Sequence, residues 1–560
     1  MYLNKPYLIY ICYIIALLLT STSLINAQQI YLKVNGANKN EDFFLKKNLN
    51  DSIFSSGATL ENELRSLETK IKENGYFQYK QLSTVKKDSF YFAKYSLGLQ
   101  TDTIIISIPN NYPILHKILE STNSYTKLPI TQTSSYLNNI TKELAKEGYS
   151  ISTLKLENHQ LKDHYLYTDL DIHLDTKRQI DQLLFTPYDN FPKTIKNRLL
   201  SKYKNKPFNE TIIHRLEKEI TQFPFIKVAK APEVLFTQNN TAVYLYIDRQ
   251  NISQFDGLIG FTNDDNGKVQ FNGYADLQLM NILNKGEQLK LYWKNDGNQQ
   301  TQFNFSTEVP YLFNTPFGIK ATLELFKQDS TMLNTKFNAS VLYYFNFNSR
   351  LGIGYQTTSS VAGKENFYNA ANYNSNFLTL NYYNTKYQDH PLFRQKYYIN
   401  SSAGIGSKQE EDFIEKTPQQ FILLAANYLW QLNNRWYLNQ QIESYFINSN
   451  TRLLYNEYYR FGGIHSIRGF RENTLLAKTQ LGLYNEIRYL LAPNMYIHSI
   501  SDIAYYEGID TKETIYSFGL GFGIQTGGGL FNIIYANGVQ PNSDFKLSNA
   551  IFHLSYKTQF

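Results

Sequence analysis

The sequence predicts two kinds of structure in one chain: three α+β repeats of the form β-α-α-β-β, and then a 16-stranded antiparallel transmembrane β-barrel. Three observations support this fold class. Apolar and polar residues alternate in strand after strand from about Phe255 to Phe560, no helix-long apolar run follows residue 27, and one helical pattern recurs three times before residue 250. A bilayer core offers the backbone no water, so only helices and closed barrels cross it. Two-sided strands behind an export signal therefore indicate an outer-membrane barrel.

The overall composition narrows the class of protein. The 560 residues predict two or more domains. The net charge of +7 comes from 55 basic and 48 acidic residues without a basic block, so we expect no nucleic-acid partner. The 46 Tyr and 37 Phe, beside only 3 Trp, suit strands and membrane interfaces. A soluble all-β protein could share this composition.

The N-terminus has the order of an export signal. Lys5 precedes an almost purely apolar run over residues 7–19, and Ala27 offers a small residue before a cut at Gln28. We therefore assign residues 1–27 to a signal peptide, the alternative being an uncleaved anchor. The only cysteine, Cys12, lies inside the apolar run, so the mature chain would hold neither a disulfide nor a thiolate metal site.

Residues 28–250 contain the repeat. Each copy places three apolar residues at spacings of three and four, which is one face of a helix, and an aromatic residue follows five positions later. The triplets are Leu64, Leu67 and Ile71, then Leu137, Ile140 and Leu144, and then Ile213, Leu216 and Ile220. Two strand-like runs follow each helix. We place the three domains at residues 28–108, 109–177 and 178–250; coincidence among amphipathic helices is the alternative.

Residues 251–560 read as the barrel. Eleven strand-like segments precede residue 450 and five follow residue 475, and their sum of sixteen is even, as single-chain bacterial barrels require. In the best strands apolar and polar residues separate cleanly; Phe518 and Leu520 alternate with Ser517 and Gly519. A soluble β-sandwich with one wet face per sheet is the alternative. The gap between the two groups predicts a long inward loop over residues 450–476.

That loop carries the main candidate site. Arg468 offers five donors in a planar fork suited to carboxylates, and it could anchor the loop in a polar lumen. Gly469 would let the backbone approach the wall, and Phe470 could pack against inner side chains. Two carboxylates are candidate partners of Arg468: Glu486, on the polar face of its strand, and Asp502. An exposed loop arginine is the alternative.

Two features resemble a known family. The β-α-α-β-β unit resembles the polypeptide-transport-associated (POTRA) domain, and three such units before a barrel resemble TamA-like members of the BamA/TamA superfamily. Ile467-Arg468-Gly469-Phe470 is similar to the [VI]-R-G-[FY] signature of that superfamily. Residues 500–504 resemble its F-x-D-x-G strand motif, with Ile500 and Ala504 as departures. The resemblance implies that this motif supplies Asp502 as the partner of the arginine, so we expect Asp502 to be the first partner of Arg468 and Glu486 to be the second.

The resemblance implies an outer-membrane insertase or translocase that assists β-barrel or autotransporter-like clients without nucleotide energy. Its POTRA domains would lie in the periplasm and receive unfolded clients, partly by pairing strands with them. The first and last barrel strands, here residues 255–262 and 546–560, would form a seam that opens sideways. We assign this seam to Gly257, Gly260, Tyr556 and Phe560, since glycine weakens a strand and a terminal aromatic marks such barrels.

Other functions stay open at this stage. A two-partner-type secretion porin would pass one exoprotein through the lumen, and lipid transport to the outer membrane also fits a TamA-like architecture. Outer-membrane lipids and an inner-membrane-anchored periplasmic partner are compatible with these readings. We expect no enzyme and no cofactor, because the sequence has no supported Ser/His/Asp arrangement and no His pair at metal spacing. Gly527, Gly528 and Gly529 fit a hairpin turn better than a phosphate loop.

Overall fold

The computed structural model describes residues 29–120, 123–238, 240–263, 269–295, 300–363, 369–541 and 549–559. The chain forms two compact units. The first unit comprises the chain up to Arg178 together with the short segment Pro207–Asn209. The second unit comprises Gln179–Lys206 and the chain from Glu210 onward. The signal peptide predicted for residues 1–27 lies outside the described residues.

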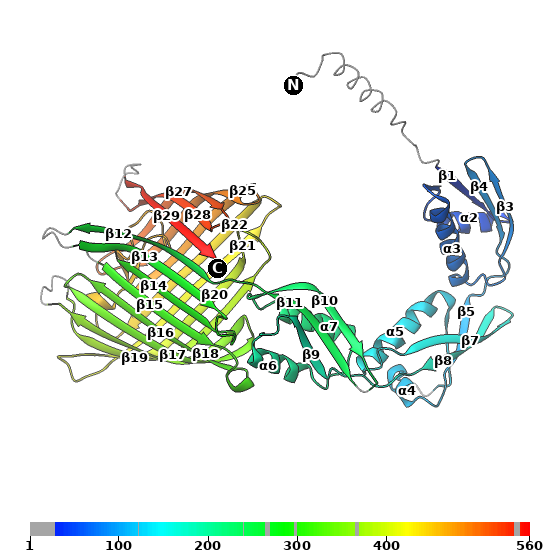
Figure 1. Ribbon diagram of the computed structural model, residues 1–560, viewed down its shortest axis with the longest axis horizontal. Coiled ribbons are helices and arrows are strands. Elements are labelled where there is room, and N and C mark those ends of the chain that lie inside the picture. Colours follow the sequence, from blue (N-terminus) through cyan, green and yellow to red (C-terminus); the bar gives the residue numbers. More distant parts are fainter. Residues whose placement is uncertain are drawn as a thin grey trace, which may run out of the picture. The chain divides into compact units, whose positions relative to one another are not determined.

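The first domain is a four-stranded sheet covered by two helices (Figure 1). Its elements are β1 (Ile30–Asn35), α2 (Lys39–Asn48), β2 (Ile53–Phe54), α3 (Gly57–Glu73), β3 (Lys80–Lys87) and β4 (Phe90–Ser96), and the sheet order is β2-β1-β4-β3. Helix α3 starts at a capping box made by Ser56 and Thr59. Its residues Leu67 and Ile71, two of the predicted triplet, are fully buried against the sheet. The helical repeat therefore marks the core face of this domain.

The second domain repeats this layout. Its elements are β5 (Thr103–Ser107), α4 (Pro113–Leu119), β6 (Tyr125–Pro129), the 3-10 helix η1 (Ile130–Gln132), α5 (Thr133–Lys146), β7 (Thr153–Lys162) and β8 (Tyr165–His173), with sheet order β6-β5-β8-β7. The predicted boundary between residues 108 and 109 is wrong, because β5 pairs in parallel with β8 and belongs to the second sheet. Short strands β2 and β6 between the helices also extend the predicted β-α-α-β-β pattern.

The third domain has the predicted order without an added strand. Its elements are β9 (Gln182–Pro187), α6 (Lys193–Tyr203), α7 (Glu210–Ile220), β10 (Ile226–Phe236) and β11 (Thr241–Arg249), in a sheet of order β10-β11-β9. Leu216 and Ile220, from the third predicted triplet, are buried. Phe225, the aromatic residue after that triplet, is buried as well.

This third domain packs against turns of the barrel. The Asn281 side-chain amide donates a hydrogen bond to the Tyr188 hydroxyl at 2.9 Å, and the ring of Phe347 lies 4.9 Å from that of Phe223. Burial raises the pKa of Tyr188, so this hydroxyl stays protonated and donates in turn to Asn284 at 3.1 Å. The contacts fix the domain to the β13–β14 and β17–β18 turns.

The barrel is closed, antiparallel and built from sixteen strands, as the sequence predicts (Figure 1). The strands before the long loop are β12 (Gln254–Asn263), β13 (Val269–Met280), β14 (Gln288–Asn295), β15 (Gln300–Val309), β16 (Phe317–Gln328), β17 (Met332–Asn346), β18 (Ser349–Ala362), β19 (Tyr373–Tyr387), β20 (Gln395–Glu410), β21 (Thr417–Gln431) and β22 (Trp436–Ser449). Those after it are β25 (Thr479–Ala492), β26 (Met495–Glu507), β27 (Lys512–Gln525), β28 (Leu530–Val539) and β29 (Ile551–Gln559). A 3-10 turn, η2 (Leu312–Asn314), joins β15 to β16.

The wall has an apolar outside and a polar inside. On β27, Phe518 is 51% exposed and Leu520 is 69% exposed, whereas Ser517, which precedes Phe518 on the opposite face, is fully buried. The same alternation puts Phe552, Leu554 and Tyr556 of β29 outside. Exposed apolar side chains on the outer face of a closed barrel suit contact with lipid.

No helix in the described part of the chain combines the length and the apolar character needed to cross a bilayer.

Candidate functional site

The long loop between β22 and β25 folds into the barrel. It contains a 3-10 turn, η3 (Tyr455–Glu457), and a short hairpin of β23 (Tyr459–Phe461) and β24 (Leu475–Ala477). Phe461 and Ile467 are buried in a cluster with Tyr484 and Ala504 of the wall. Since the loop contacts inward-facing residues on many strands, it occupies the lumen, in agreement with the inward loop predicted over residues 450–476.

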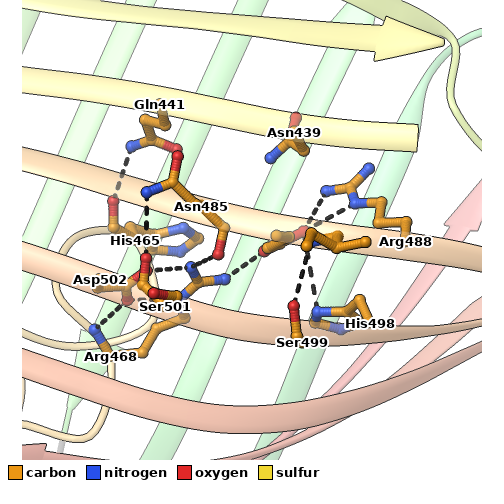
Figure 2. Close-up of polar contacts among 12 residues, drawn as sticks. Asn439, Gln441, His465, Arg468, Asn485, Arg488, His498, Ser499, Ser501 and Asp502 are labelled. Carbon is orange, nitrogen blue, oxygen red and sulfur yellow. Dashed lines mark hydrogen bonds and ion pairs between the residues drawn. The ribbon is translucent and has the colours of Figure 1, made fainter. Parts of the chain in front are cut away.

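Arg468 lies at the innermost part of this loop and pairs with Asp502 of β26 (Figure 2). Its Nε donates to Asp502 Oδ2 at 2.8 Å, its Nη2 donates to Oδ1, and its backbone N–H donates to Oδ2 at 3.1 Å. The relative exposures of Arg468 and Asp502 are only 5% and 2%. A bidentate, buried pair of this kind fixes both the position and the orientation of the loop.

The second predicted partner, Glu486 of β25, is also in contact with Arg468. It accepts a hydrogen bond from Arg468 Nη1, and its other oxygen accepts one from Arg488 Nε at 2.7 Å. His498 of β26 completes the group, with its Nδ1 3.9 Å from Glu486 (Figure 2). Two guanidinium groups thus share two carboxylates. The arrangement can hold a polar loop in a polar wall, and it contains no evident nucleophile beside a base.

Gly469 and Phe470 hold the loop against a third strand. Gly469 has φ +78, a value that favours glycine, and a Cβ built there would lie 2.4 Å from the backbone nitrogen of Gly538 on β28. The ring of Phe470 covers Gly538, where an added Cβ would meet it at 2.5 Å. Two glycines facing each other therefore permit the close approach.

Sequence reasoning missed a second attachment at the base of the loop. Glu457 accepts from Lys408 Nζ of β20 at 2.8 Å and from Gln419 Nε2 of β21 at 2.8 Å. The side chain of the adjacent Asn456 donates to Ser360 Oγ of β18 at 2.6 Å. Lys408 and Glu457 are ordinary charged residues 49 positions apart, so nothing in the sequence links them.

The described seam residues lie on the first and last strands, beyond the three residue pairs that join these strands. Gly257 and Gly260 are in β12, and Tyr556 is on β29 with its side chain outside, while Phe560 lies beyond the described residues. Only three residue pairs join the described parts of the two strands: Gln254–Gln559, Phe255–Thr558 and Asp256–Lys557. On its other side, β12 pairs continuously with β13 from Gln254–Gln278 to Asn263–Val269. The pairing across the seam ends just before Gly257.

Comparisons with known proteins agree on the fold. No family model and no curated protein matched the sequence. Among solved structures, CdiB from Escherichia coli matches with 12% identity and a TM-score of 0.52, covering 90% of this chain and 98% of its own. CdiB from Acinetobacter baumannii matches with 11% identity and a TM-score of 0.51 over the same shares. A BamA from Haemophilus ducreyi lacking POTRA domains 1–3 matches with 13% identity and a TM-score of 0.46, covering 82% of this chain and 99% of its own.

The fold class predicted from the sequence is thus confirmed: three small α+β domains precede a closed 16-stranded antiparallel barrel. At these identities the likeness concerns the fold alone. The closer kinship to TamA-like proteins stays a prediction.

Proposed function

We propose that this protein is an outer-membrane insertase or translocase that assists the assembly or secretion of β-barrel or autotransporter-like clients through the seam between β12 and β29. It acts without catalytic residues and without a cofactor. Its POTRA-like domains lie in the periplasm and receive the unfolded client. The barrel then offers the client an opening towards the lipid.

The short pairing between β12 and β29 carries this proposal. Each backbone hydrogen bond in a sheet contributes about 1 kcal/mol net, so three residue pairs hold the seam far more weakly than a complete strand pairing would. Gly257, directly after the last pair, weakens β12 further. Unpaired backbone groups facing a bilayer are costly, and a client strand would satisfy them. The seam is therefore a place where a client strand gains bonds.

The periplasmic domains supply exposed strand edges. In the first domain, β3 is an edge strand whose eight residues are all exposed. In the second and third domains, β7 and β10 occupy edges as well. Pairing at a sheet edge uses main-chain hydrogen bonds and so tolerates clients of different sequence.

A reconstituted assay tests the proposal directly. The purified full chain is placed in liposomes, an unfolded β-barrel client is added, and client folding is followed by its resistance to protease and its shifted gel mobility. We expect the liposomes that contain this protein to fold the client faster than empty liposomes and than liposomes with an unrelated 16-stranded porin. Equal rates in all three would refute the insertase function.

Two alternative functions predict other results on depletion from cells. Loss of several outer-membrane proteins is the outcome expected here. Altered lipid asymmetry with normal barrel proteins would instead identify a lipid transporter, and loss of one secreted protein would identify a secretion porin. An inner-membrane-anchored periplasmic partner is compatible with the insertase and with the lipid transporter. Affinity purification of the full chain after cross-linking through residues 28–250 would detect such a partner.

A further inference from the structure

The inner end of the long loop touches the wall on both sides of the seam. This segment, residues 465–473, contains Arg468 and its neighbours on one side. On the other side it reaches β14 and β15, which belong to the N-terminal part of the barrel. The family-like signature at residues 467–470 accounts only for the first set of contacts.

The contacts on the C-terminal side are numerous and buried. Arg468 binds Asp502 and Glu486 on β26 and β25, and Gly469 and Phe470 rest on β28. The side chains of Arg468 and Asp502 are 6% and 0% exposed. This side of the segment is firmly held.

The contacts of residues 465–473 with β14 and β15, on the N-terminal side of the seam, are fewer and more exposed to solvent. Glu472 forms an ion pair with Lys294 of β14, Asn473 donates to Gln302 of β15 at 3.4 Å, and the ring of His465 lies edge-on to Tyr292 of β14, 6.3 Å between ring centres. The side chains of Lys294 and Glu472 are 27% and 19% exposed. The ion pair is the single charged contact of residues 465–473 with the described parts of these two strands.

The order of strands places the seam between the two sets of contacts. Around the closed barrel, β28 is followed by β29, the seam, β12, β13 and β14 in that order. The segment therefore spans the seam from inside the lumen. Any separation of β12 from β29 that carries β14 away from β28 must stretch or break one set of its contacts.

We propose that residues 465–473 form an internal latch across the seam, and that the Lys294–Glu472 ion pair is the contact that releases when the seam opens. The buried Arg468 group stays with the C-terminal strands, and the partly exposed Lys294–Glu472 pair separates, because water can solvate both charges as they part. A client or a neighbouring charge in the lumen that competes for Lys294 or Glu472 would favour opening. The inference rests on the proposed function only in taking β12–β29 as the moving boundary.

Spin labels at register partners of the seam measure the latch without any client. Labels are attached to Phe255→Cys and Thr558→Cys in a Cys12→Ser background, in liposomes, and the distribution of label distances is recorded. We expect the separated population to rise about fivefold in Lys294→Gln and equally in Glu472→Gln, with no further rise when both are combined. The exchanged pair, Lys294→Glu with Glu472→Lys, should restore the original distribution.

Lys336→Gln is the matched control, because it removes another lumen ion pair, Lys336–Glu324 at 3.1 Å, which joins β17 to β16 and is not among the contacts of residues 465–473. It should leave the label distances unchanged. Distances in Lys294→Gln and Glu472→Gln equal to those of the parent, or an equal rise in Lys336→Gln, would overturn the latch. Because no client is present, a latch that fails here leaves the insertase assay unaffected, and an inactive insertase with label distances that respond would leave the latch standing.

Discussion

Two sectors of the barrel wall are built in opposite ways. At the seam, three residue pairs join β12 and β29 across the described parts of these strands. Around the anchor, β26 pairs with β27 without interruption from Met495–Ile524 to Glu507–Lys512. Strand β25 pairs with β26 from Thr479–Glu507 to Ala492–Met495, with a break at Glu486 and Ile487, and these two strands hold Arg468 through two carboxylates. Three residue pairs hold the first sector together, and the second sector carries the buried ion pairs of the loop.

The difference indicates that the two sectors have separate roles, one in opening and the other in anchoring the loop. A loop that must stay in place needs a wall that does not move, and a wall that opens cannot carry a buried ion group whose separation would cost several kcal/mol. The inner end of the loop is therefore anchored on strands that pair along most of their length, and that end is only lightly attached across the seam. Substitutions can test whether the two sectors are independent.

Arg468→Ala should have the largest effect. It leaves Asp502 and Glu486 as neighbouring buried carboxylates without their shared cation, at a cost of about 3 kcal/mol or more. We expect the loop to leave the lumen, detected as protease cleavage within residues 450–476 in folded barrels, and client folding to fall sharply. Arg468→Lys should retain only part of the loop protection and of the client folding, since an ammonium group cannot form the bidentate contact. Full protection in Arg468→Ala would contradict the anchor.

Asp502→Asn should cost more than Glu486→Gln. Asp502 accepts three hydrogen bonds from Arg468, including one from its backbone, whereas Glu486 accepts one and retains Arg488 as a partner. Loop protection from protease in each single variant measures the ranking. The opposite ranking would mean that Glu486 is the main anchor.

Gly469→Ala should displace the loop tip by an intermediate amount. Its φ of +78 strains an L residue, and the added Cβ would lie 2.4 Å from the Gly538 nitrogen, at a cost of about 1–3 kcal/mol. Gly527→Ala is the control, because a Cβ at that position meets nothing within 4 Å. Thermal unfolding of the two variants compares them, and equal midpoints would show that the close approach is not needed.

Tyr274→Phe should have the smallest effect and acts at the seam. The Tyr274 hydroxyl donates to the Asp256 carboxylate at 2.6 Å, next to the last seam pair, and its removal should weaken this region by about 1 kcal/mol. We expect a slight rise in the separated population of the seam labels and unchanged loop protection. Tyr516→Phe, on the lipid-facing side of β27, serves as the control. Altered loop protection in Tyr274→Phe would mean that the sectors are coupled.

The sequence was sufficient to predict those parts of the structure that depend on residues close together in the chain. Alternation along each strand gave sixteen strands and the position of the loop, and the triplets marked the core faces of the three small domains. Arg468, Asp502 and Glu486 could be joined because each sits in a recognisable context. The first domain boundary failed because β5 reads like any short apolar strand, and only its pairing with β8 assigns it.

The missed contacts share a physical cause. Lys294 and Glu472 are 178 positions apart, and Lys408 of the wall and Glu457 of the loop are 49 positions apart. Each pair depends on how the loop crosses a closed barrel, a property of the tertiary fold. The number of pairs at the seam depends likewise on how the two ends of the sheet meet, so glycine content suggested a weak seam without giving its length.

Locking the seam tests the central claim most directly. The pair Phe255→Cys and Thr558→Cys, opposite each other across the seam, is oxidised to a disulfide, and the pair Leu483→Cys and Ile503→Cys, opposite each other on β25 and β26, is the control. We predict that the seam disulfide abolishes client folding, that reduction restores it, and that the control disulfide changes little. Client folding that continues at the parent rate with the seam fully cross-linked would contradict the account.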